Sequence, residues 1–351
     1  MTSEMSAKDE KLLIDLGWNA VLQQSLNDII VGDTATPVVG RVSRLDRGWS
    51  TVMMSASGET MRTRNIGADV AVGDWVLISA DGERVDRVLQ RYSALTRRVS
   101  SDVVKAESHT VAANIDTVFL VQSASSDTNQ RRLERELVLA FDSGAQPVIV
   151  VNKSDLVDDA TMATMLADIR QVAQGVTVHF VSAVDGTGLD ALRRYGSGHR
   201  TLVVLGASGV GKSMLVNALA GSSSQNTGAV RSSDQRGRHT TVAAELVPLL
   251  GGGWLIDTPG LRAVSLWISH RGIELAFADV FTVTESCRFR DCKHESEPDC
   301  AVCAAVAAGA FSQERLNNMR ALVAEEVALE QEQVEHKRSD NRKGVRRPRP
   351  A

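Results

Sequence analysis

The octapeptide GASGVGKS, which covers Gly206 to Ser213, constrains this chain more than any other feature. It matches the pattern G-x-x-x-x-G-K-[ST], and its surroundings fit, because an apolar run precedes it and the helical pattern MLVNALAG follows. Glycines in such a loop let backbone N–H groups close around phosphate oxygens, and the N-terminus of the helix adds partial positive charge. The residues that we expect around the phosphates are Gly206, Ala207, Ser208, Gly209, Val210, Gly211, Lys212, Ser213 and Met214, although the Met214 side chain should not touch the nucleotide.

Specific side chains complete the phosphate end of this predicted site. Lys212 would reach the β- and γ-phosphates in a catalytic role, and the Ser213 hydroxyl would bind Mg²⁺. In WLIDTPG an apolar strand ends at Asp257, where a nucleoside triphosphatase places the carboxylate that holds Mg²⁺, usually through water. The N–H of Gly260, in the same motif, is positioned to sense the γ-phosphate.

A second motif, NKSD, comprises Asn152, Lys153, Ser154 and Asp155. It follows the apolar run PVIVV, so it lies at the carboxyl end of a predicted strand, where α/β sheets bind ligands. Asp155 could accept hydrogen bonds from the N1–H and the exocyclic amine of guanine, which adenine cannot supply, and an unpaired buried carboxylate makes the wrong base costly. Lys153 would lie along the plane of the base, and Asn152 would tie this loop to the phosphate loop.

The order of these elements in the chain is unusual. A guanine-reading element normally follows the phosphate loop, whereas here NKSD precedes it. The next strand ends in VSAVDGTGL, where Ser182 and Ala183 fit the backbone element that contacts the guanine O6, and it also precedes the phosphate loop. A sheet tolerates new termini when the old ones lie close together, so the order predicts a circular permutation. The alternative is a P-loop ATPase or kinase in which NKSD has no role, and competition by ATP against GTP separates the two.

Hydrophobic patterning divides the chain into successive parts. Short β-branched runs broken by Gly and Asp turns predict an OB-like barrel, a fold that often binds oligonucleotides; a packing or dimerisation barrel is the alternative. Strand–helix alternation from Asp116 predicts a largely parallel sheet covered on both faces, and residues 304–337 predict helix. The fold class is therefore multi-domain α/β. The expected boundaries are a helical leader at 1–35, an OB-like barrel at 36–98, a linker at 99–115, a circularly permuted GTPase domain at 116–270, a zinc-binding helical domain at 271–336 and a basic disordered tail at 337–351.

All four cysteines fall in one short segment, which favours a metal site over disulfides. Cys287, Cys292, His294 and Cys300 have the spacing C-x₄-C-x-H-x₅-C. Three thiolates and one imidazole make a closed tetrahedral Zn²⁺ site, which is structural because no position stays open for a reactant. Cys303 leaves two alternatives, since it could replace Cys300 or replace His294.

The whole arrangement resembles the circularly permuted ribosome-small-subunit-dependent GTPase A family. The resemblance rests on the order NKSD, SA, GASGVGKS, GRHTT and DTPG, with a small barrel before it and a Cys/His cluster after it, and covers roughly residues 36–330. It implies a GTPase that assists late maturation of the small ribosomal subunit and leaves it after hydrolysis. It also implies that the zinc ligands are Cys287, Cys292, His294 and Cys300.

The resemblance bears on the catalytic groups as well. Leu261 stands where many GTPases carry a water-orienting Gln, so slow intrinsic hydrolysis is expected. In GRHTT, the resemblance suggests that His239 approaches the attacking water; the alternative is a loop residue that touches phosphate or RNA. Thr241, in preference to Thr240, would bind Mg²⁺ as the switch threonine.

Charge and composition bound the partners. The segment 337–351 holds seven basic residues and one acidic residue within a chain of net charge −4, which favours contact with rRNA over a solvated solubility tail. There is neither a secretory pattern nor an apolar run long enough to cross a membrane, so we expect a cytoplasmic protein without a membrane partner. No long heptad seam is evident, so we expect a monomer. The rival from another functional class is a non-catalytic RNA-binding scaffold that uses the guanine nucleotide as a structural ligand.

Overall fold

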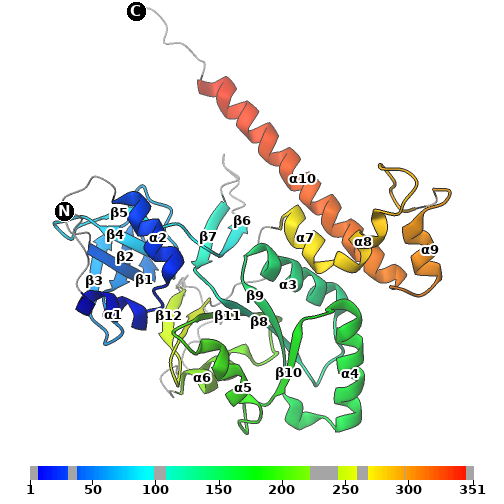
Figure 1. Ribbon diagram of the computed structural model, residues 1–351, viewed down its shortest axis with the longest axis horizontal. Coiled ribbons are helices and arrows are strands. Elements are labelled where there is room, and N and C mark those ends of the chain that lie inside the picture. The colour runs from blue at the N-terminus through cyan, green and yellow to red at the C-terminus, as the bar shows by residue number, and fades with distance from the viewer. Residues whose placement is uncertain are drawn as a thin grey trace, which may run out of the picture.

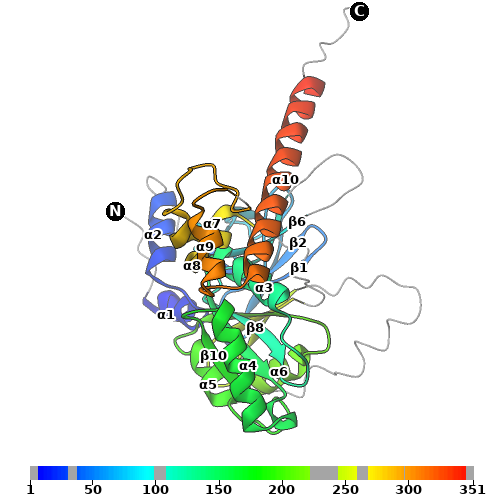
Figure 2. The same cartoon turned by 90° about the vertical axis from the view of Figure 1, so that its right-hand side faces the viewer.

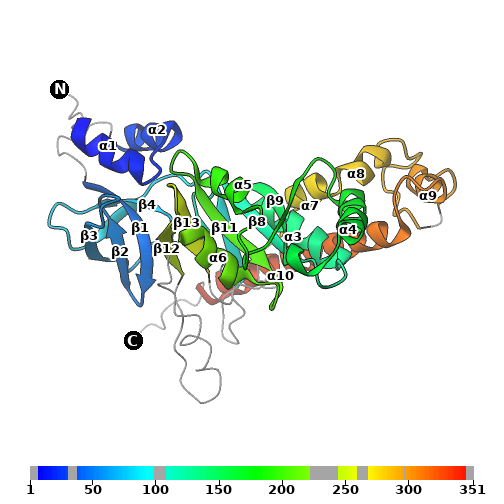
Figure 3. The same ribbon diagram turned by 90° about the horizontal axis from the view of Figure 1, so that it is seen from below.

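The computed structural model describes residues 7–30, 38–98, 108–221, 244–258, 268–295 and 297–344. Three parts lie side by side along the long axis of the molecule: an N-terminal β part, a central α/β part and a C-terminal helical part (Figure 3). The multi-domain α/β fold class is thus confirmed. Within the described residues, none of the helices combines the length and apolarity needed to cross a membrane.

The N-terminal part is a small closed barrel. Its strands are β1 (Val38–Asp46), β2 (Trp49–Met53), β3 (Thr60–Arg64), β4 (Trp75–Ile78) and β5 (Val85–Val88). β1 pairs antiparallel with both β2 and β4, β2 pairs with β3, and β4 pairs with β5. A parallel bridge between Arg64 and Arg84 joins β3 to the start of β5 and closes the circuit. This order, with β1 shared by two neighbours and a parallel closure, confirms the OB-like barrel.

Two helices, α1 (Ala7–Asp15) and α2 (Ala20–Ile29), cover one side of the barrel (Figure 1). Asn19 begins α2, because its side chain accepts hydrogen bonds from the N–H groups of Val21 and Leu22. The buried face of α2 carries Leu22 and Leu26, which pack into the same core as Trp75 of β4. The expected helical leader is therefore part of the folded molecule.

The predicted barrel and linker differ in detail from the structure. β6 (Ala94–Arg98), which we expected at the end of the barrel, instead pairs antiparallel with β7 (Ser108–Ala113), which we expected in the linker. Ala113 donates its N–H to the carbonyl of Val72, so this two-stranded ribbon is attached to the barrel. Sequence patterning shows that a run has strand character but not which strand it pairs with.

The central part is a parallel sheet in the order β10-β9-β8-β11-β13, extended by the antiparallel β12. Its strands are β8 (Thr117–Ser123), β9 (Gln146–Asn152), β10 (Thr177–Val181), β11 (Thr201–Gly206), β12 (Glu245–Pro248) and β13 (Trp254–Asp257). The pairing of Arg44 with Glu245 joins β12 to β1, so the barrel and the central sheet are continuous.

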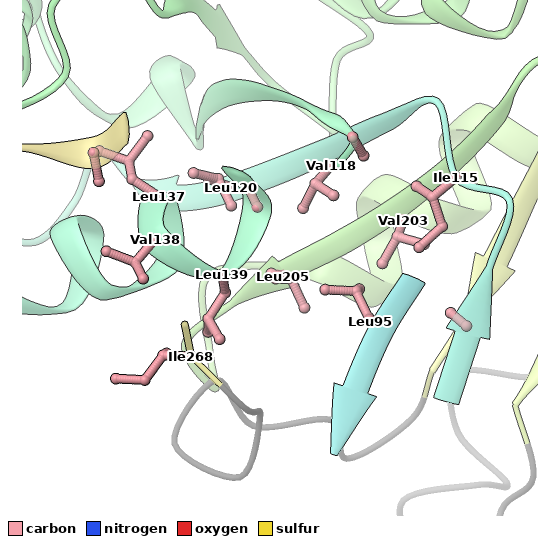
Figure 4. Close-up of a cluster of buried hydrophobic side chains, with 14 of the residues drawn as sticks. Leu95, Ile115, Val118, Leu120, Leu137, Val138, Leu139, Val203, Leu205 and Ile268 are labelled. Carbon is pink, nitrogen blue, oxygen red and sulfur yellow. The ribbon is translucent and has the colours of Figure 1, made fainter. Parts of the chain in front are cut away.

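Helices cover both faces of this sheet because alternate strand residues point to opposite sides. Val118 and Leu120 of β8 pack with α3 (Gln130–Asp142) and α4 (Asp159–Val172), whereas Phe119 and Val121 pack with α5 (Leu189–Arg193) and α6 (Lys212–Ala220). Short 3₁₀ turns are η1 (Ser154–Leu156) and η2 (Arg194–Gly196). Figure 4 shows the core beneath α3, with side chains from the strands and the helix lying together.

The C-terminal part consists of α7 (His270–Ala276), α8 (Ala278–Thr284), α9 (Ala301–Ala307) and α10 (Gln313–Gly344). The far end of α10 projects away from the rest of the molecule (Figures 1 and 2). We expected one helix over 304–337 and disorder beyond it. A break at Gly309, whose φ is +76°, separates α9 from α10, and α10 continues to Gly344. The expectation of disorder for residues 337–344 is therefore corrected.

Candidate nucleotide and metal sites

The phosphate loop has the geometry that its motif predicts. It leaves β11 at Gly206 and enters α6 at Lys212, with φ values of +148° at Gly206, +86° at Gly209 and +95° at Gly211. A Cβ at Gly206 would lie 2.4 Å from the carbonyl oxygen of Val121, so only glycine fits beside the neighbouring strand. The Lys212 ammonium donates to the carbonyls of Gly206 (2.8 Å) and Ala207 (2.5 Å).

The NKSD loop lies directly against the phosphate loop, and Asn152 is the residue that joins them. Its buried side chain donates from Nδ2 to the carbonyl of Val210 at 3.0 Å and accepts at Oδ1 from the N–H of Ala183 at 3.1 Å. The Lys153 ammonium donates to the carbonyl of Gly209 at 2.8 Å. One buried amide therefore fixes three loops, NKSD, SA and GASGVGKS, relative to one another.

The other residues of these two loops set the path of the chain on either side of Asn152. Lys153 has a φ of +66°, and this left-handed residue turns the chain into η1, where Asp155 is exposed. Ser182 is fully buried, and its Oγ accepts from the N–H groups of Val184 and Asp185, both at 3.3 Å. These bonds shape the loop after β10, so that the Ala183 N–H reaches Asn152.

Two of the residues predicted to bind Mg²⁺ are described by the structure, and both lie at this edge of the sheet. Ser213 is in the first turn of α6, and Asp257 ends β13, which runs parallel to β11 at its side. Asp257 therefore ends the strand next to the one that leads into the phosphate loop and Ser213. Gly260, Leu261, His239, Thr240 and Thr241 lie outside the described residues.

Sequence reasoning missed a polar pair beside the phosphate loop. Glu136 of α3 is 1% exposed, and its Oε2 accepts from Nε2 of Gln122 at 2.9 Å. The run RRLERELVLAFD looks amphipathic, and its acidic residues look solvent-facing. The spacing did indicate burial, because residues three or four positions apart lie on the same face of a helix. Glu136 is three positions after Leu133 and four before Ala140, and both of these are buried.

The four predicted metal ligands come together in the C-terminal part. The ligand atoms of Cys287, Cys292, His294 and Cys300 all lie within 4.8 Å of one another. The Sγ atoms of Cys287 and Cys300 are 3.9 Å apart, and each is 3.6 Å from Nδ1 of His294. In a tetrahedral site with ordinary metal–sulfur and metal–nitrogen bonds these separations are about 3.8 and 3.5 Å. The cluster could therefore hold a tetrahedral metal ion.

Cys303 lies outside this cluster, which favours the ligand set with Cys300 and His294 over the alternatives that its spacing left open. Its thiol donates to the carbonyls of His294 (3.3 Å) and Glu295 (3.8 Å), while its N–H donates to Sγ of Cys300 at 3.4 Å. Burial acts to raise the pKa of Cys300, but the Cys303 N–H and His294 outweigh it and lower that pKa to about 6. Cys303 thus supports a thiolate at Cys300 through its backbone.

A buried polar network attaches the C-terminal helices to the central part. Arg315 of α10 donates to both oxygens of Asp279, at 2.6 and 2.8 Å, and to Oε1 of Glu134 on α3 at 2.9 Å. Nearby, Arg135 of α3 makes a two-pronged ion pair with Glu325 of α10, at 2.6 and 2.8 Å. The helix α3 therefore touches the phosphate-loop side through Glu136 and the C-terminal part through the two residues before it.

A phosphate loop joined to an NKSD loop that precedes it in the chain, on a parallel sheet, defines a circularly permuted P-loop GTPase. The RsgA GTPase family model matches residues 88–267. The chain is 39% identical over 99% of its length to the small ribosomal subunit biogenesis GTPase RsgA of Streptomyces coelicolor, of which it covers 95%. This chain belongs to the RsgA GTPase family, and its enzymatic class is that of a GTP hydrolase.

Solved structures agree with this assignment. The crystal structure of YjeQ from Thermotoga maritima aligns with a TM-score of 0.62 at 26% identity, over 83% of this chain and 99% of that one. YloQ, described as a circularly permuted GTPase, aligns with a TM-score of 0.57 at 24% identity, over 85% of this chain and 97% of that one. The second likeness concerns the fold alone.

Proposed function

We propose that this protein binds the small ribosomal subunit, assists its late maturation and hydrolyses GTP with stimulation by the subunit, which it leaves after hydrolysis. The observation that carries the nucleotide part is the double hydrogen bond of Asn152, which joins the phosphate loop to the NKSD and SA loops. The ribosomal part of the proposal is supported by the name of the relative with which the chain aligns along almost its full length.

In this proposal the base lies between the NKSD and SA loops. The exposed carboxylate of Asp155 accepts from the N1–H and exocyclic amine of guanine, and the backbone of the SA loop, at Ser182 and Ala183, faces the guanine O6. The Lys153 stem lies along the base, because its ammonium is already anchored at the carbonyl of Gly209. Adenine lacks both donors, so it leaves the carboxylate unpaired.

At the other end of the nucleotide, the phosphate loop binds the α-, β- and γ-phosphates through its backbone N–H groups and Lys212. Ser213 and Asp257 would hold Mg²⁺, which neutralises phosphate charge when it is bound. Water attacks the γ-phosphorus, the bond to the bridging oxygen breaks, and GDP and phosphate leave. Three further residues lie outside the part of the chain that the structure describes. We propose that Gly260 senses the γ-phosphate, that Thr241 binds Mg²⁺ and that His239 approaches the attacking water.

We infer that the metal of the Cys/His cluster is Zn²⁺, held by Cys287, Cys292, His294 and Cys300. Three thiolates and one imidazole favour zinc over hard cations, which prefer oxygen ligands. All four positions are protein ligands, so the ion is structural. It fixes the loop between α8 and α9.

The partner surfaces belong to the same proposal. The barrel and the basic residues of the C-terminal segment contact rRNA, and the protein acts as a cytoplasmic monomer. On the barrel, the guanidinium groups of Arg62 and Arg64 lie 5.0 and 5.3 Å from the centre of the Trp49 ring. Both arginines are exposed, so RNA phosphates could reach them. Contacts of this kind make binding depend steeply on salt.

The test is GTP hydrolysis by the purified protein, alone and with isolated small ribosomal subunits, beside an Asp155→Asn control. We expect a slow basal rate that rises by orders of magnitude with subunits, and little stimulated GTP hydrolysis by the variant. Equal rates with and without subunits would remove the ribosome from the proposal. Subunit binding that ignores the nucleotide would instead favour a scaffold.

A further inference from the structure

Glu136 of α3 and Gln122 of β8 form a buried polar pair between the helix and the sheet. Glu136 is 1% exposed and Gln122 is 7% exposed, and the one hydrogen bond between them measures 2.9 Å. A carboxyl group is rarely buried unless it is paired, because removing its charge from water is unfavourable. A carboxyl in this position therefore suggests a role beyond packing.

The pair lies next to the phosphate loop. In the register of β8 and β11, Val121 is opposite Gly206, so Gln122 is the residue beside the point where the phosphate loop begins. Lys212 folds back onto the first two carbonyls of that loop. Its positive charge, like that of Arg132 one turn earlier on α3, favours the ionised form of Glu136 and so lowers the pKa of that carboxyl.

The balance of these influences leaves Glu136 close to half-protonated at neutral pH. Burial raises its pKa to about 7, and the Gln122 hydrogen bond and the charges of Arg132 and Lys212 keep it from rising further. Other charged groups packed against α3 have different partners in the described chain. Arg315 faces Glu134, and Glu325 faces Arg135.

We propose that nucleotide phosphates compete with the Glu136 carboxylate for the positive charge of Lys212. The inference rests on the nucleotide site of the proposed function. When phosphates arrive, their negative charge disfavours the ionised form of Glu136, so nucleotide binding takes up a proton at this carboxyl. The affinity should therefore be higher when Glu136 is protonated, and lower when it is ionised.

The experiment measures the dissociation constant of GDP with Mg²⁺ from pH 6 to pH 8.5, for the full-length protein and for Glu136→Gln. Glutamine resembles the protonated carboxyl in size and charge. We expect the ratio of the wild-type constant to the variant constant to be near one at pH 6. It should climb several-fold by pH 8.5, since one unit of pKa change corresponds to about a tenfold change in affinity. Titration of GDP itself cancels in this ratio.

A ratio that stays constant across the pH range would overturn the proposal, because a merely structural role shifts affinity equally at every pH. Gln122→Leu gives a second test should Glu136→Gln fold poorly. It keeps the carboxyl but removes the donor that stabilises its ionised form, so the loss of affinity should move to higher pH; an unmoved profile contradicts the proposal. Absence of GDP binding by the wild-type protein at every pH would instead reject the nucleotide site.

Discussion

Asn152 shows how a single side chain can make a site out of segments that are far apart in the sequence. Its amide has one donor and one acceptor in use, one for the phosphate loop and one for the SA loop. Both partners are backbone groups, so the contact fixes the path of the chain and not only a side chain. The loops need this junction wherever the chain begins, which explains why a permuted order leaves the site intact.

At Gly211 the two loops approach so closely that we expect no side chain to fit. A Cβ there would lie 2.4 Å from Nδ2 of Asn152, on a residue whose φ is +95°. We expect Gly211→Ala to weaken GDP binding by at least tenfold, measured by equilibrium titration. Gly175→Ala is the control, because Gly175 also has a positive φ (+76°) but nothing lies within 4 Å. It should lose about 1 kcal/mol of stability and keep its affinity for GDP. Equal effects of the two substitutions on binding would contradict the close approach.

The sequence was most informative where a motif is short and its chemistry local. The phosphate loop, the NKSD loop and the cysteine spacing were all predictable, and so was the tie between Asn152 and the phosphate loop. The burial of Glu136 was not, because it depends on how α3 packs against β8, and a helix pattern does not say which strand it covers. The alternatives at Cys303 also needed coordinates, since two ligand sets share its spacing.

At the scale of elements, the segment between α8 and α9 should depend on its metal ion. We expect Cys300→Ser to lose bound zinc, measured by atomic emission, and to become sensitive to protease between α8 and α9, while GDP binding persists. Cys303→Ser is the matched control. Because the Cys303 thiol donates to the carbonyls of His294 and Glu295 and is not one of the four clustered ligands, this variant should keep its metal. Loss of zinc from Cys303→Ser, with retention by Cys300→Ser, would reverse our ligand assignment.

The junction of α3 with α8 and α10 depends on a buried charge network. The side chains of Arg315 and Glu134 are 4% and 1% exposed, whereas those of Arg135 and Glu325 are 14% and 39% exposed. Removing one partner from a buried pair leaves a charge uncompensated, so we expect Arg315→Met to destabilise the protein by about 3–5 kcal/mol. Arg135→Met should lose about 1 kcal/mol or less. Denaturant midpoints measure both, and similar losses would contradict the distinction.

Element boundaries were less predictable than element types. The run 94–98 has strand character, but it pairs with β7 and not with the barrel, because pairing is decided by contacts remote in the sequence. Helix α10 continues through a segment whose charge pattern favoured disorder. Charge runs disfavour burial, yet they do not prevent a helix from continuing into solvent when its first turns are held by packing.

At the scale of the whole molecule, the permuted order places the C-terminal part directly after the strand that carries Asp257. The C-terminal part is also attached to α3, the helix that carries Glu136 beside the phosphate loop. The phosphate-loop end of the sheet is therefore connected to the C-terminal part in two ways, by the chain that follows β13 and by the packing of α3 against α10. The barrel is joined to the sheet through the pairing of β12 with β1, so the central part lies between the barrel and the C-terminal part (Figure 3).

The most direct test of the central claim is the base preference of the wild-type protein and Asp155→Asn for GDP and xanthosine diphosphate. Our account predicts that the wild type prefers GDP by orders of magnitude, because Asp155 accepts from two guanine donors. The variant should prefer the xanthine nucleotide, whose C2 carbonyl accepts from the new amide. An unchanged preference for GDP in the variant would show that NKSD does not read the base, and would contradict a guanine site assembled in permuted order.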